Sequence, residues 1–574
     1  MKRTILWLLL CIFICLDAQI NEMQVLLNQA RMLESRNQFS QAMEIYESLY
    51  ERFSTDENLN EAILRVSYVS GDFEKARLYL DRGKGKLTPY FLAKQEAVYQ
   101  LKLNRVKEAE KIAFDWLDKN RGVMHHYTEF ARLFESSALF DVAIEIYTRN
   151  REVSKDENLH ALELSNAYYY IKNIDKCFEE SLKYLRINPG YLYMYKNRIN
   201  ELVSDNPVNI RKLTALIAER EPDQVLELLA FAYVEVKDFT AASEIYEKLP
   251  IDKLIRFADD LKSDSYLDFA LATYQKALNL SEVPIIIADL RIKIAQIFFE
   301  TNNIEECIII LAEVIDDEEI QKPSFRNRTR ANVESRLLMA LINIQQNNDI
   351  IEIRRWFEEA SNFAINQIEK SEILFRLARY LYLKEEYFEA NKVIEQAVYR
   401  QDIYSNIFKS SYFYRYEIAL FQKDEARDSL LTECIIHFSQ DPRITDMLFL
   451  ETFLNNINND DIKTGFLQAL KYKGLYQDSL AIATILEIAD TSRIEELYIL
   501  AYEWGFKSTT YDLVQTIEDY TFRNPLLNDF IFLQRMRNTE DIDTRRNMIS
   551  NFLNNNPQNV FSPQLRSILF NIRS

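Results

Sequence analysis

The chain has 574 residues, of which 48% are hydrophobic and 27% are charged, a balance typical of globular proteins. Its 8 glycines and 11 prolines are too few for dinucleotide-binding folds, P-loop proteins, β-propellers and turn-rich β-sandwiches, which need glycine at fixed backbone positions. The formal net charge of −19 argues against a general nucleic-acid binder, because contacts to phosphates need a basic surface. Composition therefore predicts a long, acidic, all-helical protein.

The first residues have the features of a secretory signal peptide. A basic start over residues 1–3 precedes an apolar run over residues 5–16, and Ala18 offers a small residue for cleavage. As a helix the run spans about 18 Å, too short for a bilayer core of about 30 Å. An uncleaved anchor and a lipoprotein are the alternatives, although the residues before Cys11 and Cys15 do not fit a lipoprotein signal. We expect an exported, periplasmic protein, or else an outer-membrane-associated or secreted one, with no membrane span after cleavage.

A repeat follows in the next part of the chain. A small residue recurs at spacings of 33 or 34 residues, with a bulky residue three positions earlier and, in all units but one, a second small residue twelve positions earlier. Small residues on two helices let the pair cross closely, and turn-prone polar residues stand between them. Each unit is thus predicted to be a helix-turn-helix that buries its apolar face only by stacking on its neighbours, as in a solenoid. The recurring small residues are Ala42, Ala76, Ala109, Ala143 and Cys177.

Two stretches resemble a known family. Residues 70–76 (Ser-Gly-Asp-Phe-Glu-Lys-Ala) and residues 164–170 (Leu-Ser-Asn-Ala-Tyr-Tyr-Tyr), with a closing Pro189, resemble the tetratricopeptide repeat (TPR). The resemblance implies an all-α fold, a right-handed α-solenoid of stacked helix-turn-helix repeats. The match departs from the family where Leu64 fills a slot that is normally small. Similar but less regular units are centred on Ala242, Ala270, Cys307, Ala390 and Ser479.

The pattern predicts a division of the chain into five parts. These are a signal peptide at 1–18, five regular TPR units at 19–190, degenerate and variant units at 191–316, irregular helices with TPR-like units at 317–442, and C-terminal TPR-like helical units with a cap at 443–574.

Catalytic chemistry has no support in the sequence. The four histidines stand outside any metalloprotease, nucleophile or nucleotide-binding motif, so we expect neither an enzyme nor a cofactor. Cys434 and His437 are three residues apart and supply at most two metal ligands, so we expect no metal. Cys177 and Cys307 occupy the small slot of their units, which predicts buried thiols that behave as small hydrophobes.

The resemblance also implies a concave groove lined by the first helix of each unit, where TPR proteins usually hold peptides or other proteins. Arginine recurs at the groove position next to the small residue, and aromatic and lysine residues lie one turn away. Guanidinium groups fork onto carboxylates, so these residues predict capture of an acidic segment. The alternative is that each arginine pairs with a nearby acid such as Glu34 or Glu135. The predicted groove residues are Arg31, Arg65, Tyr68, Lys94, Arg132, Asn166, Tyr169 and Arg379.

The sequence therefore favours a non-catalytic, exported scaffold that binds partner proteins or peptides, acidic segments among them, and no nucleic acid. Such a protein would serve assembly, secretion or division at the cell envelope. The alternative is a helical-repeat protein that binds glycans at the cell surface. That alternative would want exposed tryptophan platforms, and only Trp116, Trp356 and Trp504 remain after cleavage.

Overall fold

A computed structural model describes residues 23–218, 220–321, 329–402, 404–506, 511–539 and 541–573. Every regular element in these ranges is a helix, which confirms the all-α prediction. The predicted signal peptide lies outside them. The chain forms two compact units, one up to Phe257 and one from Ala258 onward, with the division inside helix α15 (Ile251–Ser263). We describe the two units separately.

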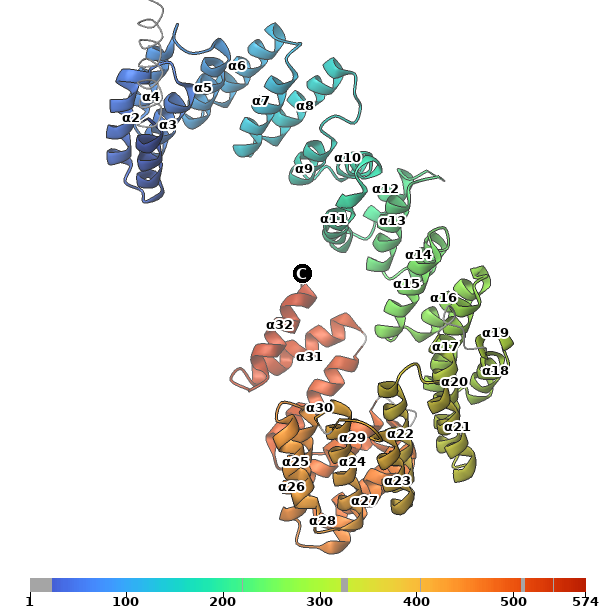
Figure 1. Cartoon of the computed structure of the whole chain (residues 1–574). Helices are drawn as coiled ribbons and strands as arrows, with labels where there is room; N and C mark the ends of the chain where they lie inside the picture. Colours follow the sequence, from blue (N-terminus) through green and yellow to red (C-terminus); the bar gives the residue numbers. More distant parts are fainter. Residues whose placement is uncertain are drawn as a thin grey trace, which may run out of the picture. The chain divides into compact units, whose positions relative to one another are not determined.

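Unit 1 is a series of antiparallel helix pairs, blue to green in Figure 1. A helix over residues 23–35 shares a hydrophobic core with α2. Most later helices pair with the next one along the chain. The elements are α2 (Phe39–Phe53), α3 (Glu57–Val69), α4 (Phe73–Gly83), α5 (Pro89–Lys102), α6 (Val106–Lys119), α7 (Met124–Ser136), α8 (Phe140–Ser154), α9 (Ala161–Tyr170), α10 (Ile174–Ile187), η1 (Pro189–Tyr191), α11 (Leu192–Asp205), α12 (Asn209–Ala215), α13 (Asp223–Glu235) and α14 (Phe239–Tyr246).

Unit 2 continues with helix pairs, green to red in Figure 1. Its elements after α15 are α16 (Leu267–Leu280), α17 (Pro284–Glu300), α18 (Ile304–Ile315), α19 (Glu318–Gln321), α20 (Ala331–Gln345), α21 (Ile350–Phe363), α22 (Gln367–Leu383), α23 (Tyr387–Ala397), α24 (Asn406–Gln422), α25 (Arg427–Phe438), α26 (Pro442–Asn456), α27 (Asp460–Gly474), α28 (Asp478–Ser492), α29 (Glu495–Gly505), η2 (Tyr511–Leu513), η3 (Gln515–Asp519), α30 (Pro525–Asn538), α31 (Ile542–Asn555) and α32 (Ser562–Arg573).

One turn geometry recurs between the paired helices. In nearly all of these turns the second residue after the first helix has a left-handed backbone. The next N–H donates to a carbonyl five residues earlier, as Asn173 does to Tyr168 (3.0 Å). Among the described residues, the only glycine with this role is Gly71. The scarcity of glycine is therefore compatible with many tight turns, because other residues accept the left-handed strain. The turn residues are Asn37, Gly71, Asn104, Ala138, Lys172, Lys237, Ser265, Asn302, Asn347, Glu385, Lys423 and Tyr476.

This geometry predicts a stabilising substitution at Ala138, which is exposed and has a φ of 57°. Replacing Ala138 with glycine removes the Cβ that disfavours the left-handed conformation, so the free energy of unfolding should rise by about 1 kcal/mol. Urea denaturation followed by circular dichroism measures the change. Ser136→Gly, at the end of helix α7, is the control and should lower stability by about 0.5–1 kcal/mol. A loss of stability in Ala138→Gly would contradict the expectation.

The helix pair α20–α21 lies in a region where the sequence predicted irregular helices. The pair is regular, and its turn closes like the others, with Asn348 N–H donating to the Asn343 carbonyl (2.9 Å). The repeat pattern did not identify this pair because it relies on a small residue in the second helix. Here the equivalent position is occupied by Ile353, which is fully buried. One extra residue in the turn, Asp349, also breaks the spacing while it caps helix α21.

A smaller difference concerns the unit that the sequence centred on Ser479. Ser479 is exposed, and the fully buried small residue of that unit is Ala481. Ala481 stands five residues after the left-handed Tyr476, the same offset that separates Ala143 from Ala138. The position of the left-handed turn residue therefore identifies the buried small residue of a unit more reliably than the residue types of the segment do.

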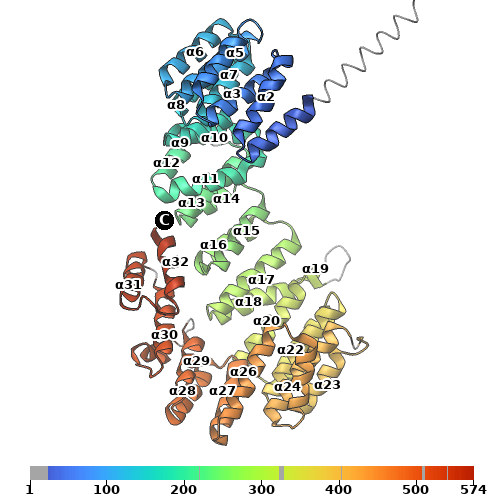
Figure 2. The ribbon, with the colours of Figure 1, turned by 90° about the vertical axis from the view of Figure 1, so that its left-hand side faces the viewer.

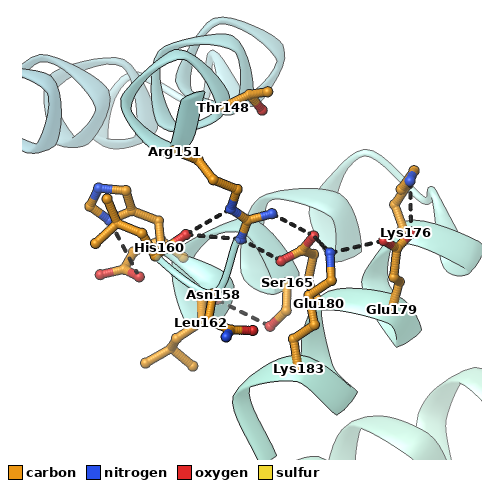
Figure 3. Close-up of polar contacts among 12 residues, drawn as sticks. Thr148, Arg151, Asn158, His160, Leu162, Ser165, Lys176, Glu179, Glu180 and Lys183 are labelled. Atoms are coloured by element: carbon orange, nitrogen blue, oxygen red, sulfur yellow. Dashed lines mark hydrogen bonds and ion pairs between the residues drawn. The ribbon is translucent and has the colours of Figure 1, made fainter. Parts of the chain in front are cut away.

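An ion pair holds the connection between α8 and α9, the segment 155–160 (Figure 3). Arg151 donates to both oxygens of Glu180 (2.7 and 2.9 Å) and, through Nε and Nη2, to the carbonyl of Leu159 (3.0 and 2.8 Å). Lys183 also donates to Glu180 (3.0 Å), whose side chain is only 4% exposed. The guanidinium thus joins helix α8, the connection and helix α10.

Candidate partner-binding groove

Unit 1 contains a hollow of about 350 Å³ on helices α3, α5 and α7, the first helices of three successive pairs. We call it the N-groove. Four of the predicted groove residues line it, namely Arg65, Tyr68, Lys94 and Arg132. The repeat places them together because residues about 33 apart occupy equivalent positions on stacked helices. The remaining lining residues are Glu61, Val69, Gln95, Val98, Lys102, Glu129 and Leu133.

Two of the cationic groups in the N-groove have acidic partners. Arg65 forms a bidentate pair with Glu34 (Nε–Oε2 3.1 Å, Nη2–Oε1 2.9 Å), and the Tyr46 hydroxyl donates to the same carboxylate. Lys94 pairs with Glu129 across the neighbouring first helices. At Arg65 the structure therefore shows the internal pairing that the sequence left as the alternative.

The other two cations, Lys102 and Arg132, are exposed. Within the ranges that the structure describes, neither has an ion pair. Glu135, one of the acids that the alternative named as partners for the arginines, accepts a hydrogen bond from the Tyr147 hydroxyl (3.0 Å). Arg132 therefore lines the N-groove with no ion pair among the residues that the structure describes.

The wall of the N-groove is apolar, with Val69, Val98 and Leu133 beside the ring of Tyr68. The Tyr68 hydroxyl is buried and has no hydrogen-bond partner in the described part of the chain. Burial raises the pKa of Tyr68 well above its usual value, so the hydroxyl stays protonated.

Asn166 and Tyr169, on helix α9, are engaged elsewhere in unit 1. Arg198 of helix α11 donates to the Asn166 side-chain oxygen (2.6 Å), and its guanidinium lies 5.1 Å from the centre of the Tyr169 ring. The Tyr169 hydroxyl donates to Glu201. These contacts satisfy both predicted residues within the protein, and neither lines the N-groove.

The last two predicted residues also lie outside the N-groove. Arg31 is exposed on the helix over residues 23–35, and Arg379 belongs to unit 2, where it lines a different hollow. Lys102 and Glu129 line the N-groove but were not among the predicted groove residues. A spacing of 35 residues between Lys94 and Glu129, one more than the repeat length, would have signalled that neighbouring first helices bring them together.

Metal chemistry has no candidate in the described ranges, which contain no cluster of three or more histidine, cysteine or acidic side chains able to hold an ion. Cys434 is buried, and His437 instead pairs with Glu433 (3.3 Å) and stacks on Tyr412. Cys177 and Cys307 are free, fully buried thiols, as predicted. None of the helices described has the length and apolar character needed to cross a bilayer.

No protein-family model matches the chain, and no curated protein matches it. Among solved structures, it is similar to the APC/C hetero-tetramer Cut9–Hcn1, with 14% identity, a TM-score of 0.27 and 95% of each chain covered. It is also similar to Naa15/Naa10 bound to HypK-THB, with 12% identity, a TM-score of 0.22, and 96% of this chain and 92% of that chain covered. A third is the apo form of the quorum sensor NprR from B. thuringiensis, with 14% identity, a TM-score of 0.22, and 66% and 98% covered.

The repeat is established by the chain itself, through successive paired helices, buried small residues at a fixed spacing and one recurring turn. The chain is an all-α protein built from a repeat of stacked helix pairs.

Proposed function

We propose that the protein is a non-catalytic scaffold whose N-groove holds an extended acidic segment of a partner protein. The observation that carries the proposal is the pair of exposed cations, Lys102 and Arg132, beside an apolar wall that includes Tyr68. A carboxylate placed there would accept charge-assisted hydrogen bonds, while an apolar side chain next to it would bury its surface on the wall.

The charge of the N-groove supports this choice of partner. Four cationic side chains line the hollow against two carboxylates, in a chain whose net charge is −19. A local reversal of sign in a concave surface concentrates the field and raises the rate of encounter with an oppositely charged segment. The pairs at Arg65 and Lys94 are partly exposed and screened by solvent, so an incoming carboxylate can compete for them.

The place of action that we propose is the cell envelope, most simply the periplasm, in assembly, secretion or division. Support for this part comes from the amino-acid sequence over residues 1–18, with its basic start and apolar run. Fractionation of the native cell, with N-terminal sequencing of the recovered protein, tests it. A protein that starts at Gln19 in the envelope fraction supports export, and one that retains Met1 in the cytoplasm contradicts it.

Binding in the N-groove is tested by reversing the two unpaired charges. In Lys102→Glu/Arg132→Glu, cross-linked capture in the native cell should lose the partner proteins. Affinity for a synthetic acidic peptide from the captured partner should fall at least tenfold. Lys107→Glu/Arg211→Glu makes the same change of charge at exposed sites outside the N-groove and should leave both measurements unchanged.

Two results would overturn the proposal. Equal loss of partner in both double variants would mean that only net charge matters. Capture of glycan without protein would favour the glycan-binding alternative.

A further inference from the structure

Unit 2 contains a second and larger hollow, of about 720 Å³, which we call the C-pocket. Its lining comes from helices α22, α24, α26, α27 and α29. We propose that the C-pocket binds a small organic acid, a carboxylate or sulfonate attached to an aromatic or aliphatic body. The proposal concerns unit 2 alone and does not depend on the N-groove.

The shape of the C-pocket comes from a departure from simple solenoid packing. Helix α27 contacts helix α22, although helices α23, α24, α25 and α26 separate them in sequence. Both lie in the same cluster of helices in Figures 1 and 2. Lys471 donates to Glu385 across this contact (2.7 Å). A Cβ on Gly474 would lie 2.7 Å from a methyl group of Leu383, so glycine leaves room for that side chain at the contact. Helices α22 and α27 both contribute side chains to the lining of the C-pocket, which is partly open to solvent.

Most of the wall of the C-pocket is aromatic and aliphatic. Phe413, Tyr414 and Phe421 of helix α24 line it together with Trp504 of helix α29. Small-molecule sites typically have volumes of about 300–1,000 Å³, apolar walls and a few polar groups that fix the orientation of the ligand. The C-pocket has this combination, and its rings offer flat surfaces on which another ring can stack.

The polar groups that fix the acid are Arg376 and Arg379. They stand one turn apart on helix α22, both exposed, and neither forms an ion pair within the residues that the structure describes. Burial raises the pKa of Tyr414, and the charges of Arg443, Arg379 and Arg376 act in the opposite direction. Two guanidinium groups at this spacing can donate to one anion.

The remaining charges of the C-pocket are mostly engaged. Arg443 forms a bidentate pair with Asp441 (2.7 and 3.0 Å) and lies 3.9 Å from the centre of the Phe413 ring. Lys473 pairs with Asp478 (2.9 Å). Glu417 accepts a hydrogen bond from the Tyr382 hydroxyl.

One carboxylate of the lining, Asp446 on helix α26, is exposed and has no ion pair among the described residues. It stands on a different helix from the two arginines. Arg376 and Arg379 are therefore the adjacent pair of cations available to an anion.

The probe for the test is 8-anilinonaphthalene-1-sulfonate, an aromatic sulfonate that fluoresces when its rings leave water. With the full chain it should show saturable binding, and light absorbed by Trp504 should reach the bound probe. In Arg376→Gln/Arg379→Gln the dissociation constant should rise at least tenfold. In Trp504→Phe the energy transfer should fall while the dissociation constant changes less than threefold.

Competition defines the ligand class. The acid 3-phenylpropanoate should displace the probe, whereas the neutral 3-phenylpropanamide should not. Arg400→Gln/Arg493→Gln removes two exposed arginines of unit 2 outside the C-pocket and should bind the probe like the unchanged protein. Equal thermal midpoints of the double variants show that folding is unaffected.

Three results would overturn the proposal. These are no saturable binding, equal binding by the Arg376/Arg379 double variant, and displacement by the amide as well as the acid. Because none of the substituted residues lines the N-groove, the outcome leaves the proposed capture of an acidic segment to its own test.

Discussion

Replacing Arg151 with methionine is expected to lower the free energy of unfolding of unit 1 by about 3 kcal/mol. The substitution keeps most of the apolar stem of the side chain but removes the guanidinium. Glu180, with a side chain 4% exposed, is then left with Lys183 as its only charged partner in the described residues, and the Leu159 carbonyl loses two donors. Removing one member of a buried ion pair typically costs about 3–5 kcal/mol, because an uncompensated charge stays out of water.

Two further variants separate this explanation from a loss of packing. Arg149→Met changes an arginine on the same helix whose pair with Glu145 is exposed, and should cost about 0–1 kcal/mol. In Arg151→Met/Glu180→Leu no unpaired carboxylate remains, so much of the lost stability should return. Thermal and urea denaturation by circular dichroism measure all three. A double variant less stable than Arg151→Met alone would sink the charge-burial explanation.

The architecture was largely predictable because it depends on short-range rules. A period near 34 residues, set by Ala42, Ala76 and their equivalents, determines where helices cross, and these residues are fully buried as expected. The prediction was wrong at the pair α20–α21, where Ile353 fills the small slot and Asp349 lengthens the turn. A pattern based on residue size misses such a pair, whereas a pattern based on the turn finds it.

The candidate site was predictable only in part. From the repeat period, Arg65, Lys94 and Arg132 were expected on one surface, because equivalent positions on stacked helices face the same way. All three line the N-groove. The repeat period could not show which of these cations already form ion pairs with acidic residues of the protein. The partner of each arginine depends on rotamers and on side chains from other helices, as when Tyr147 takes the carboxylate of Glu135.

The contact between helices α22 and α27 could not be predicted from the sequence. A nearest-neighbour solenoid has no such contact. Here it is made by the close approach of Gly474 to Leu383 and by the hydrogen bond from Lys471 to Glu385. The C-pocket follows from this contact, so of the predicted site residues only Arg379 pointed to it.

The second large effect on stability is expected at the buried small residue that recurs in each repeat. Replacing Ala109 with leucine should lower the free energy of unfolding by about 2–3 kcal/mol. Ala109 is fully buried on helix α6 and belongs to the core that helices α5, α6 and α7 share. Added methylene groups have no free volume there, so helix α6 must move away from α5 or the side chain must leave its preferred rotamer.

Lys111→Leu is the matched control, since Lys111 is exposed on the same helix and a leucine there adds no volume to the core. Its stability should change by less than about 0.5 kcal/mol. Hydrogen exchange by mass spectrometry locates the effect: in Ala109→Leu, protection should fall in α5 and α6 first, because repeat units depend on their nearest neighbours. If Ala109→Leu is as stable as Lys111→Leu, the close helix crossing does not require a small residue, and the period near 34 residues must have a physical basis other than helix packing.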